Sequence, residues 1–265
     1  MTPDPARVRA VLETVAEEEI APYFGRLQGE AVRTKSSPND LVTIVDEKVE
    51  ATLRSALVDL APGSAFIGEE AATANPEIVK GLGGAGRYWV VDPLDGTRNF
   101  VRGVEEYGLI VAYVENGQTL MGWIHDIPNR RCVTAVAGAG VDNLGPVDLR
   151  PAAALPNGLR SVGWLRPQWR DRLTQNLKAN TSTSADHCSA YAYLKLARGE
   201  YDFKLTSRVH PWDHAAGVLI LAEAGGYARW LDDGVAYTPG ETLDRPFLTS
   251  APGRDWDGLA NLILN

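Results

Sequence analysis

Apolar residues in the first sixty positions recur mostly at helical spacing. From Pro5 to Leu27 they fall every three or four residues while Glu17 to Glu19 stay on the other side, which predicts an amphipathic helix. A second helix is predicted from Glu47 to Leu60, with Asp46 placed to cap it. The polar stretch from Val32 to Asp46 lies between them and predicts a mobile hairpin.

The next part of the chain carries strand patterns. Phe66 to Glu70 indicates a short strand that runs out into two acids, and the apolar run Trp89 to Val91 indicates a buried strand that ends at Asp92. The Gly- and Ala-rich segment 71–86 between them predicts a loop with one helical turn at most. Turn sequences then separate three strands that are expected to pair antiparallel, at 108–115, 120–126 and 131–137.

A loop-like stretch from about Gly138 to Asn157 predicts a boundary between two halves, 1–145 and 146–265, of a single domain that spans 1–265. Beyond it, strands and helices alternate, which favours a layered α/β fold. The predicted elements are a strand at 159–163, helices at 167–179 and 189–198, a strand at 201–205, a helix at 212–224, strands at 227–231 and 246–249, and a helix at 256–264.

Composition narrows the classes of partner. The net charge is −8, which argues against broad binding to nucleic acid or to an anionic membrane. Two cysteines, Cys132 and Cys188, are too few for a disulfide framework and suit a reducing compartment. No apolar run reaches transmembrane length and the first residues do not resemble a signal peptide, so a cytoplasmic location is expected.

The segment from Asp92 to Phe100 contains the first candidate metal ligands. Asp92 and Asp95 leave the same Pro- and Gly-containing turn, and carboxylates this close repel each other unless a cation lies between them. Oxygen ligands favour Mg²⁺ over Zn²⁺. The backbone amides of Gly96 and Thr97 follow and are available to an anion. Taken alone, the segment is also typical of an ordinary surface turn.

Two further signals are individually weak. Gly68-Glu69-Glu70 is also typical of a solvated strand exit, and Asp213, in the first turn of a predicted helix, is also typical of a helix cap. No Ser-His-Asp or Cys-His pattern indicates a side-chain nucleophile. Taken together, these motifs resemble those of the inositol monophosphatase family. The segments that carry the resemblance are Lys35 to Thr43, Gly68 to Glu70, Asp92 to Phe100, Trp212 to Gly217 and Glu223 to Gly226.

The resemblance implies a five-layered αβαβα sandwich of the α/β (α+β) class, usually a homodimer. Two or three Mg²⁺ ions would lie in a cleft between the halves. The implied activity is lithium-sensitive hydrolysis of a small phosphate monoester, such as a sugar or polyol phosphate, by direct attack of a metal-activated water. Such hydrolysis needs charge neutralised on both the attacking and leaving oxygens.

Carried over position by position, the family's metal ligands match Glu69, Asp92, the Leu94 carbonyl, Asp95 and Asp213. Thr97 and Asp46 match the pair that orients and deprotonates the water, with Glu69 beside them. The amides of Gly96 and Thr97 would hold the phosphate, and Lys35 lies on the loop that closes over the site.

The chain departs from inositol-specific members at two substrate contacts. A Gly-Thr-Ala segment falls on His187-Cys188-Ser189, and an acid that contacts the polyol falls on Thr206, which argues against myo-inositol 1-phosphate. Arg208 is either a solvated surface residue or a contact for an anionic group, which would favour a 3′(2′),5′-bisphosphate nucleotide. Histidinol phosphate stays open as a substrate. So does a different class of role, as an interaction protein in transcription or RNA maturation.

Overall fold

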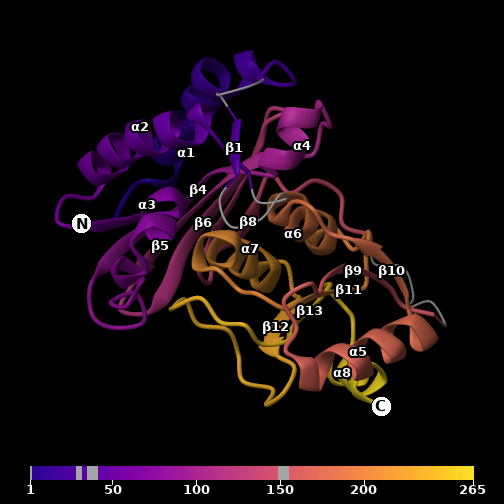
Figure 1. Ribbon diagram of the computed structural model, residues 1–265. Helices are drawn as coiled ribbons and strands as arrows, with labels where there is room; N and C mark the ends of the chain where they lie inside the picture. The colour runs from indigo at the N-terminus through magenta and orange to yellow at the C-terminus, as the bar shows by residue number, and fades with distance from the viewer. Residues whose placement is uncertain (1, 28–31, 35–40, 149–154) are drawn as a thin grey trace.

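The computed structural model describes residues 2–27, 32–34, 41–148 and 155–265, and these residues form five layers (Figure 1). The five-layered αβαβα sandwich is therefore confirmed. The layers are, in order, helices α1 (Pro5–Val15) and α2 (Ile44–Leu60), a six-stranded sheet, helices α6 (Ser189–Ala197) and α7 (Pro211–Glu223), a five-stranded sheet, and helices α5 (Pro167–Asn180) and α8 (Trp256–Leu264).

The six-stranded sheet has the order β3-β4-β5-β6-β7-β8. Only β3 and β4 are parallel in this sheet, and its other neighbours pair antiparallel. The turn sequences predicted two of these antiparallel pairs, β5 with β6 and β6 with β7. Strand β4 is longer than predicted and carries both acids of the central motif, with a register shift between Asp92 and Asp95. The strands are β3 (Ala65–Gly68), β4 (Arg87–Asp95), β5 (Gly108–Glu115), β6 (Gln118–Asp126), β7 (Arg131–Val136) and β8 (Gly140–Asp142).

The second sheet has the order β10-β9-β11-β13-β12, with β10, β9 and β11 parallel. Parallel strands end at one edge of a sheet, and ligands of open α/β folds bind at that edge. Here β10 leads into α6 and β11 leads into α7, so both helices begin near this edge. The strands are β9 (Asn157–Ser161), β10 (Ser182–Ala185), β11 (Phe203–Thr206), β12 (Tyr227–Trp230) and β13 (Phe247–Ser250).

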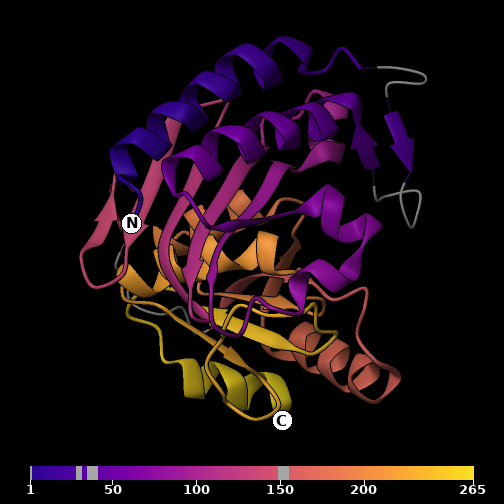
Figure 2. The ribbon, with the colours of Figure 1, turned by 90° about the vertical axis from the view of Figure 1, so that its left-hand side faces the viewer.

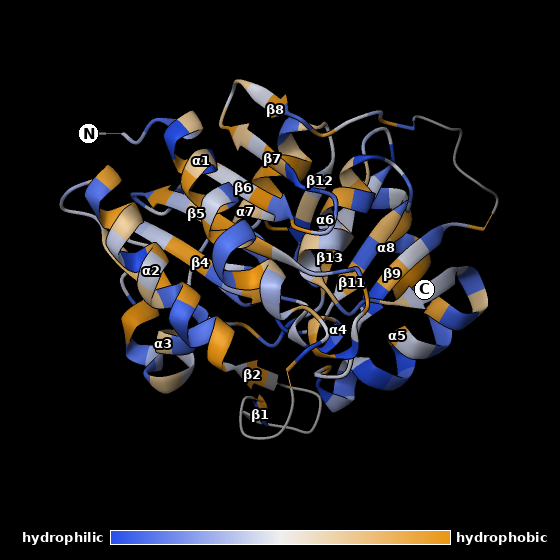
Figure 3. Ribbon diagram, turned by 90° about the horizontal axis from the view of Figure 1, so that it is seen from above, coloured by the Kyte–Doolittle hydropathy of each residue, from blue (hydrophilic) through white to orange (hydrophobic). Residues whose placement is uncertain are grey.

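Both faces of the six-stranded sheet are buried because successive side chains of a strand point to opposite faces. Trp89 and Val91 of β4 pack with α1 and α2, whereas Val90 packs with α6 and α7. Figure 2 shows α1 and α2 lying side by side over the sheet. The outer helix α5 is largely hydrophilic (Figure 3) and buries only Leu173 and Leu177. Within the described ranges, no helix is both long and apolar enough to cross a bilayer.

The N-terminal part differs from the prediction in two places. The first helix is α-helical only to Val15 and continues as a π turn (Ala16–Ile20) and a 3-10 turn (Ala21–Tyr23), where Pro22 cannot donate a backbone hydrogen bond. Helix α2 begins at Ile44 and not at Glu47. Its N-cap is Thr43, so the prediction of Asp46 as the cap was wrong. Asp46 is the third helical residue and completes a capping box.

Several short elements were not predicted as such. Glu69 begins a helix, α3 (Glu69–Ala74), followed by a 3-10 turn (Pro76–Val79), and α4 (Thr97–Arg102) follows the central motif. Strand β8 lies inside the predicted boundary loop, and β10 was missed because its sequence is polar. The predicted hairpin is present as β1 (Val32–Thr34) paired antiparallel with β2 (Leu41–Thr43), whereas the connecting loop, with Lys35, lies outside the described residues.

Candidate active site

Three predicted metal ligands converge in space. Strand β4 supplies Asp92 and Asp95, and the first turn of α7 supplies Asp213. Each offers one carboxylate oxygen, and these atoms all lie within 4.8 Å of one another. The two halves of the chain therefore both contribute to one acidic cluster.

The cluster is unfavourable unless a cation neutralises it. Burial, followed by the charges of Glu69 and Asp95, raises the pKa of Asp92 well above its usual range. Burial, followed by the charges of Asp95 and Glu69, also raises the pKa of Asp213 well above its usual range. Burial raises the pKa of Asp95 to about 6. Three clustered carboxylates, of which those of Asp92 and Asp95 are buried, offer only oxygen donors and suit a hard divalent ion such as Mg²⁺. The donor set therefore fits the metal that the sequence predicted.

Glu69 is held beside Asp92 by the start of α3. The side chains of Glu69 and Asp92 share a hydrogen bond. The buried carboxylate of Glu50 accepts the next two backbone N–H groups, from Glu70 at 2.8 Å and Ala71 at 3.1 Å. A Cβ atom at Gly68 would lie 2.2 Å from this carboxylate, so any larger residue there would displace Glu50 from its two hydrogen bonds. Glu50 was not identified from the sequence, where it is one of several acids on an amphipathic helix.

Thr97 and Asp46 are also in contact, as predicted. The Thr97 hydroxyl lies 3.2 Å from Asp46 Oδ1 and 2.9 Å from the Leu94 carbonyl oxygen. Asp46 is buried, and its Oδ2 accepts the Thr43 backbone N–H at 2.9 Å. The capping box of α2 therefore fixes the carboxylate that contacts Thr97.

Gly96 connects these ligands to α4. Its φ of 82° lies in the left-handed region, and a Cβ atom there would lie 2.8 Å from the Glu106 carbonyl oxygen. Only glycine fits this turn without strain. The turn places Thr97 at the start of α4, where the first backbone N–H groups have no partner within the helix.

The predicted substrate contacts have different surroundings. Ser189 begins α6, and its Oγ lies 3.4 Å from Lys204 Nζ. Thr206 is buried at the end of β11, and no described residue makes a hydrogen bond with its hydroxyl. Arg208 is not a freely solvated residue: it donates two hydrogen bonds to Asp244, at 2.7 and 3.0 Å, and stacks at 3.6 Å on the ring of Trp164.

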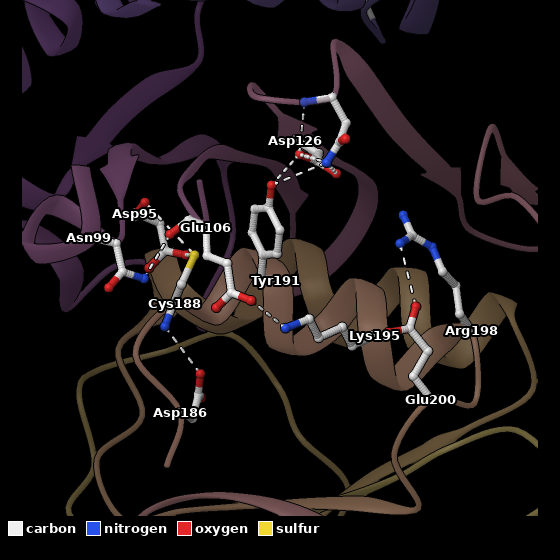
Figure 4. Close-up of polar contacts among 11 residues, drawn as sticks. Asp95, Asn99, Glu106, Asp126, Asp186, Cys188, Tyr191, Lys195, Arg198 and Glu200 are labelled. Carbon is white, nitrogen blue, oxygen red and sulfur yellow. Dashed lines mark hydrogen bonds and ion pairs between the residues drawn. The ribbon is translucent and has the colours of Figure 1, made fainter. Parts of the chain in front are cut away.

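Sequence reasoning missed the side chains that surround Asp95. The Cys188 side chain contacts its carboxylate (Figure 4). The Ala190 backbone N–H donates to the same carboxylate, and Asp186 and Lys204 form a buried ion pair nearby. The spacing around these residues gives no signal of their proximity to Asp95. A lysine inside the apolar pattern of β11 was the one visible anomaly, because lysine is rarely buried without a partner.

Comparison with known proteins gives a consistent picture. The model of the inositol monophosphatase family matches residues 5–252. Inositol-1-monophosphatase of Mycobacterium leprae is 33% identical over 243 residues, which cover 84% of this chain and 83% of that protein. Histidinol-phosphatase of Mycobacterium tuberculosis is 32% identical over 252 residues, covering 89% and 90%.

Solved structures agree on the fold. The inositol monophosphatase of Thermotoga maritima superposes with a TM-score of 0.77 at 24% identity, covering 96% of this chain and 94% of that one. An inositol monophosphatase/NADP phosphatase in complex with Mg²⁺ and phosphate gives a TM-score of 0.74 at 22% identity, covering 96% and 90%.

Proposed function

The chain belongs to the inositol monophosphatase family, and from this premise we propose how its residues carry out Mg²⁺-dependent hydrolysis of a small phosphate monoester. The observation that carries the proposal is the cluster of the Asp92, Asp95 and Asp213 carboxylates. We propose that two or three Mg²⁺ ions bind there, with Glu69 and the Leu94 carbonyl as further ligands. When bound, Mg²⁺ supplies charge neutralisation at the phosphate and lowers the pKa of a water molecule.

Thr97 and Asp46 are proposed to position the attacking water. Thr97 donates its hydroxyl proton to Asp46 or to the Leu94 carbonyl, which leaves its oxygen lone pairs to accept from a water. Asp46 and Glu69 then act as acceptors for the proton that the water loses. The amides of Gly96 and Thr97 are proposed to hold the phosphate oxygens, and Lys35 is proposed to approach from the adjoining loop.

The surroundings of Arg208 favour one class of substrate over another. Its Nε and Nη2 groups are taken by Asp244 and its face lies on Trp164, so a second phosphate would have to displace an existing ion pair. We therefore favour a monophosphate over a bisphosphate nucleotide. Among monophosphates, a polyol phosphate is disfavoured because position 206 carries threonine where an acid would contact the polyol. Histidinol phosphate is a candidate substrate beside a sugar phosphate, because the chain is similar to a histidinol-phosphatase.

Phosphate release over a substrate panel tests the proposal. The panel contains inositol 1-phosphate, histidinol phosphate, fructose 1,6-bisphosphate and 3′-phosphoadenosine 5′-phosphate, each with Mg²⁺ and with EDTA. We expect chelator-sensitive turnover, and Asp92→Ala and Glu69→Ala should lose at least about 10²-fold in kcat while keeping the wild-type circular dichroism spectrum. Full turnover in excess EDTA would contradict a metal-dependent reaction.

Three further proposals concern the location of the protein, its oligomeric state and its inhibition by lithium. Both cysteines are buried free thiols, which suits a cytoplasmic protein. A homodimer is proposed from family membership, and inhibition by lithium is expected for the same reason.

If no substrate of the panel is hydrolysed, we favour the alternative that this is an interaction protein in transcription or RNA maturation. A specific macromolecular partner that still binds Asp95→Asn would support it.

A further inference from the structure

A buried path of polar contacts leads from Lys204 to the metal ligand Asp95. Lys204 Nζ lies 2.8 Å from Asp186 Oδ2, and the two side chains are 1% and 7% exposed. The other Asp186 oxygen accepts the Cys188 backbone N–H at 3.2 Å. The Cys188 thiol then donates to Asp95 Oδ2 at 2.8 Å. Figure 4 shows Asp186, Cys188 and Asp95 following one another along this path.

The path ends on one particular oxygen of Asp95. Oδ2 accepts both the Cys188 thiol and the Ala190 backbone N–H, the latter at 2.6 Å. No described residue makes a hydrogen bond with Oδ1. Two donors on one oxygen restrict the orientation of the carboxylate and leave the other oxygen available to a cation. The carboxylate of Asp95 is therefore held in an orientation in which one oxygen can coordinate a cation.

Lys204 is itself held firmly. Its ammonium group lies 4.8 Å from the centre of the Tyr193 ring and 3.4 Å from Ser189 Oγ, in addition to the ion pair with Asp186. Lys204 comes from β11 and Asp95 from β4, so the path joins the two sheets through the turn that precedes α6. A buried ion pair is a weak source of net stability, which leaves positioning as the better account of this one.

We propose that Lys204, Asp186 and Cys188 are positioning residues that hold Asp95 as a one-oxygen ligand of the divalent cation. This inference rests on the proposed function for the presence of the cation, but it requires no particular substrate. Loss of such an outer partner typically weakens metal binding 10- to 100-fold.

Metal binding measured without substrate tests the inference. The probe is Mn²⁺, followed by loss of the free-ion EPR signal on titration into the full-length protein. Cys188→Ala should weaken the tightest Mn²⁺ site about 10-fold, whereas Cys188→Ser, which keeps a donor, should stay within about 3-fold of the wild type. The paired variant Lys204→Met/Asp186→Asn avoids leaving one buried charge unpaired and should also weaken Mn²⁺ binding about 10-fold.

A matched control comes from the ion pair of Arg254 and Asp202, whose side chains are 9% and 10% exposed. Arg254→Met/Asp202→Asn should lower Tm but leave the Mn²⁺ affinity unchanged, because this pair has no contact with Asp95. The inference is overturned if Cys188→Ala binds Mn²⁺ as the wild type does, or if Cys188→Ser is as weak as Cys188→Ala. These outcomes are separate from failure of the proposed function, which would appear as absent phosphate release with normal Mn²⁺ binding.

Discussion

Thr206 has a buried hydroxyl that costs stability, at a position that is proposed to contact the substrate. Its buried hydroxyl lacks a hydrogen-bond partner among the described residues, and a buried unsatisfied hydroxyl costs about 1–3 kcal/mol. Thr206 and Lys204 point to the same face of β11 because side chains alternate along a strand. That face meets Ser189, at the start of α6. We propose that this hydroxyl binds a polar group of the substrate.

Thr206→Val separates these two effects, since valine has nearly the same shape and no hydroxyl. We expect a Tm higher by about 2–4 °C in the absence of substrate, together with a higher KM for the best substrate of the panel. Thermal unfolding and steady-state kinetics on the same preparation measure both. A lower Tm with unchanged KM would show that the hydroxyl has only a structural partner.

His125 makes a second prediction at the residue scale, this time on pH. Burial in β6 lowers its pKa to about 4, below the 6.5 of an exposed histidine. A lowered pKa means that the neutral ring stabilises the fold above pH 6.5, and that this contribution is lost as the pH falls from 6.5 toward 4. The difference corresponds to about 3 kcal/mol, or about 6–12 °C in Tm for a chain of this size.

The measurement is Tm against pH for the wild type and His125→Gln. The wild type should lose about 6–12 °C more than the variant between pH 7 and pH 4. His187→Gln is the control, since His187 is exposed and should follow the wild type. Parallel curves for wild type and His125→Gln would contradict a neutral buried histidine.

At the scale of elements, the close contact of α6 and α7 controls where Asp213 lies. A Cβ atom at Gly217 of α7 would lie 2.2 Å from Tyr193 Cδ2 of α6. Tyr193 is fully buried and its hydroxyl lies 2.7 Å from His214 Nδ1, directly beside Asp213. The two helices can approach this closely only because position 217 has no side chain.

Gly217→Ala should therefore push the helices apart. We expect a loss of about 1–3 kcal/mol in the free energy of unfolding and weaker Mg²⁺ activation, because Asp213 moves with α7. Urea unfolding and the Mg²⁺ concentration for half-maximal activity are the measurements. Gly240→Ala is the control, since a Cβ atom there would meet nothing within 4 Å. Equal stability of the two variants would rule out the steric account.

At the scale of the whole molecule, the metal cluster connects the layers. Asp95 belongs to the six-stranded sheet and Asp213 to the central helices, so a bound cation stabilises both together. We propose that 1–265 unfolds as one unit. One thermal transition is expected with and without Mg²⁺, higher with Mg²⁺ by about 5–10 °C at a hundred times the dissociation constant. Two separate transitions in calorimetry would contradict a single unit.

The same preparation tests the proposed homodimer. Light scattering should give twice the 28.7 kDa of one chain at micromolar concentration. A mass of one chain would contradict the proposal without affecting the active site, because the three carboxylates of the cluster all come from one chain.

Local sequence determined much of this protein. The period of the apolar residues predicted most of the long helices and strands, and the resemblance to the inositol monophosphatase family assigned Asp92, Asp95 and Asp213 to one metal site. The helices and strands could be predicted because hydrophobic periodicity and turn chemistry act over a few residues. Short polar elements such as β10 and α4 escaped, since their formation depends on neighbours in space.

Only the tertiary structure decided which side chains support the acids. Cys188, Asp186 and Lys204 lie on a turn and a strand about a hundred positions from Asp95, and no spacing along the chain predicts that they meet. The tertiary structure likewise determines that Arg208 forms an ion pair with Asp244. Packing of the layers brings such residues together, and their charges and hydrogen bonds then depend on burial, which a pattern of residue types does not contain.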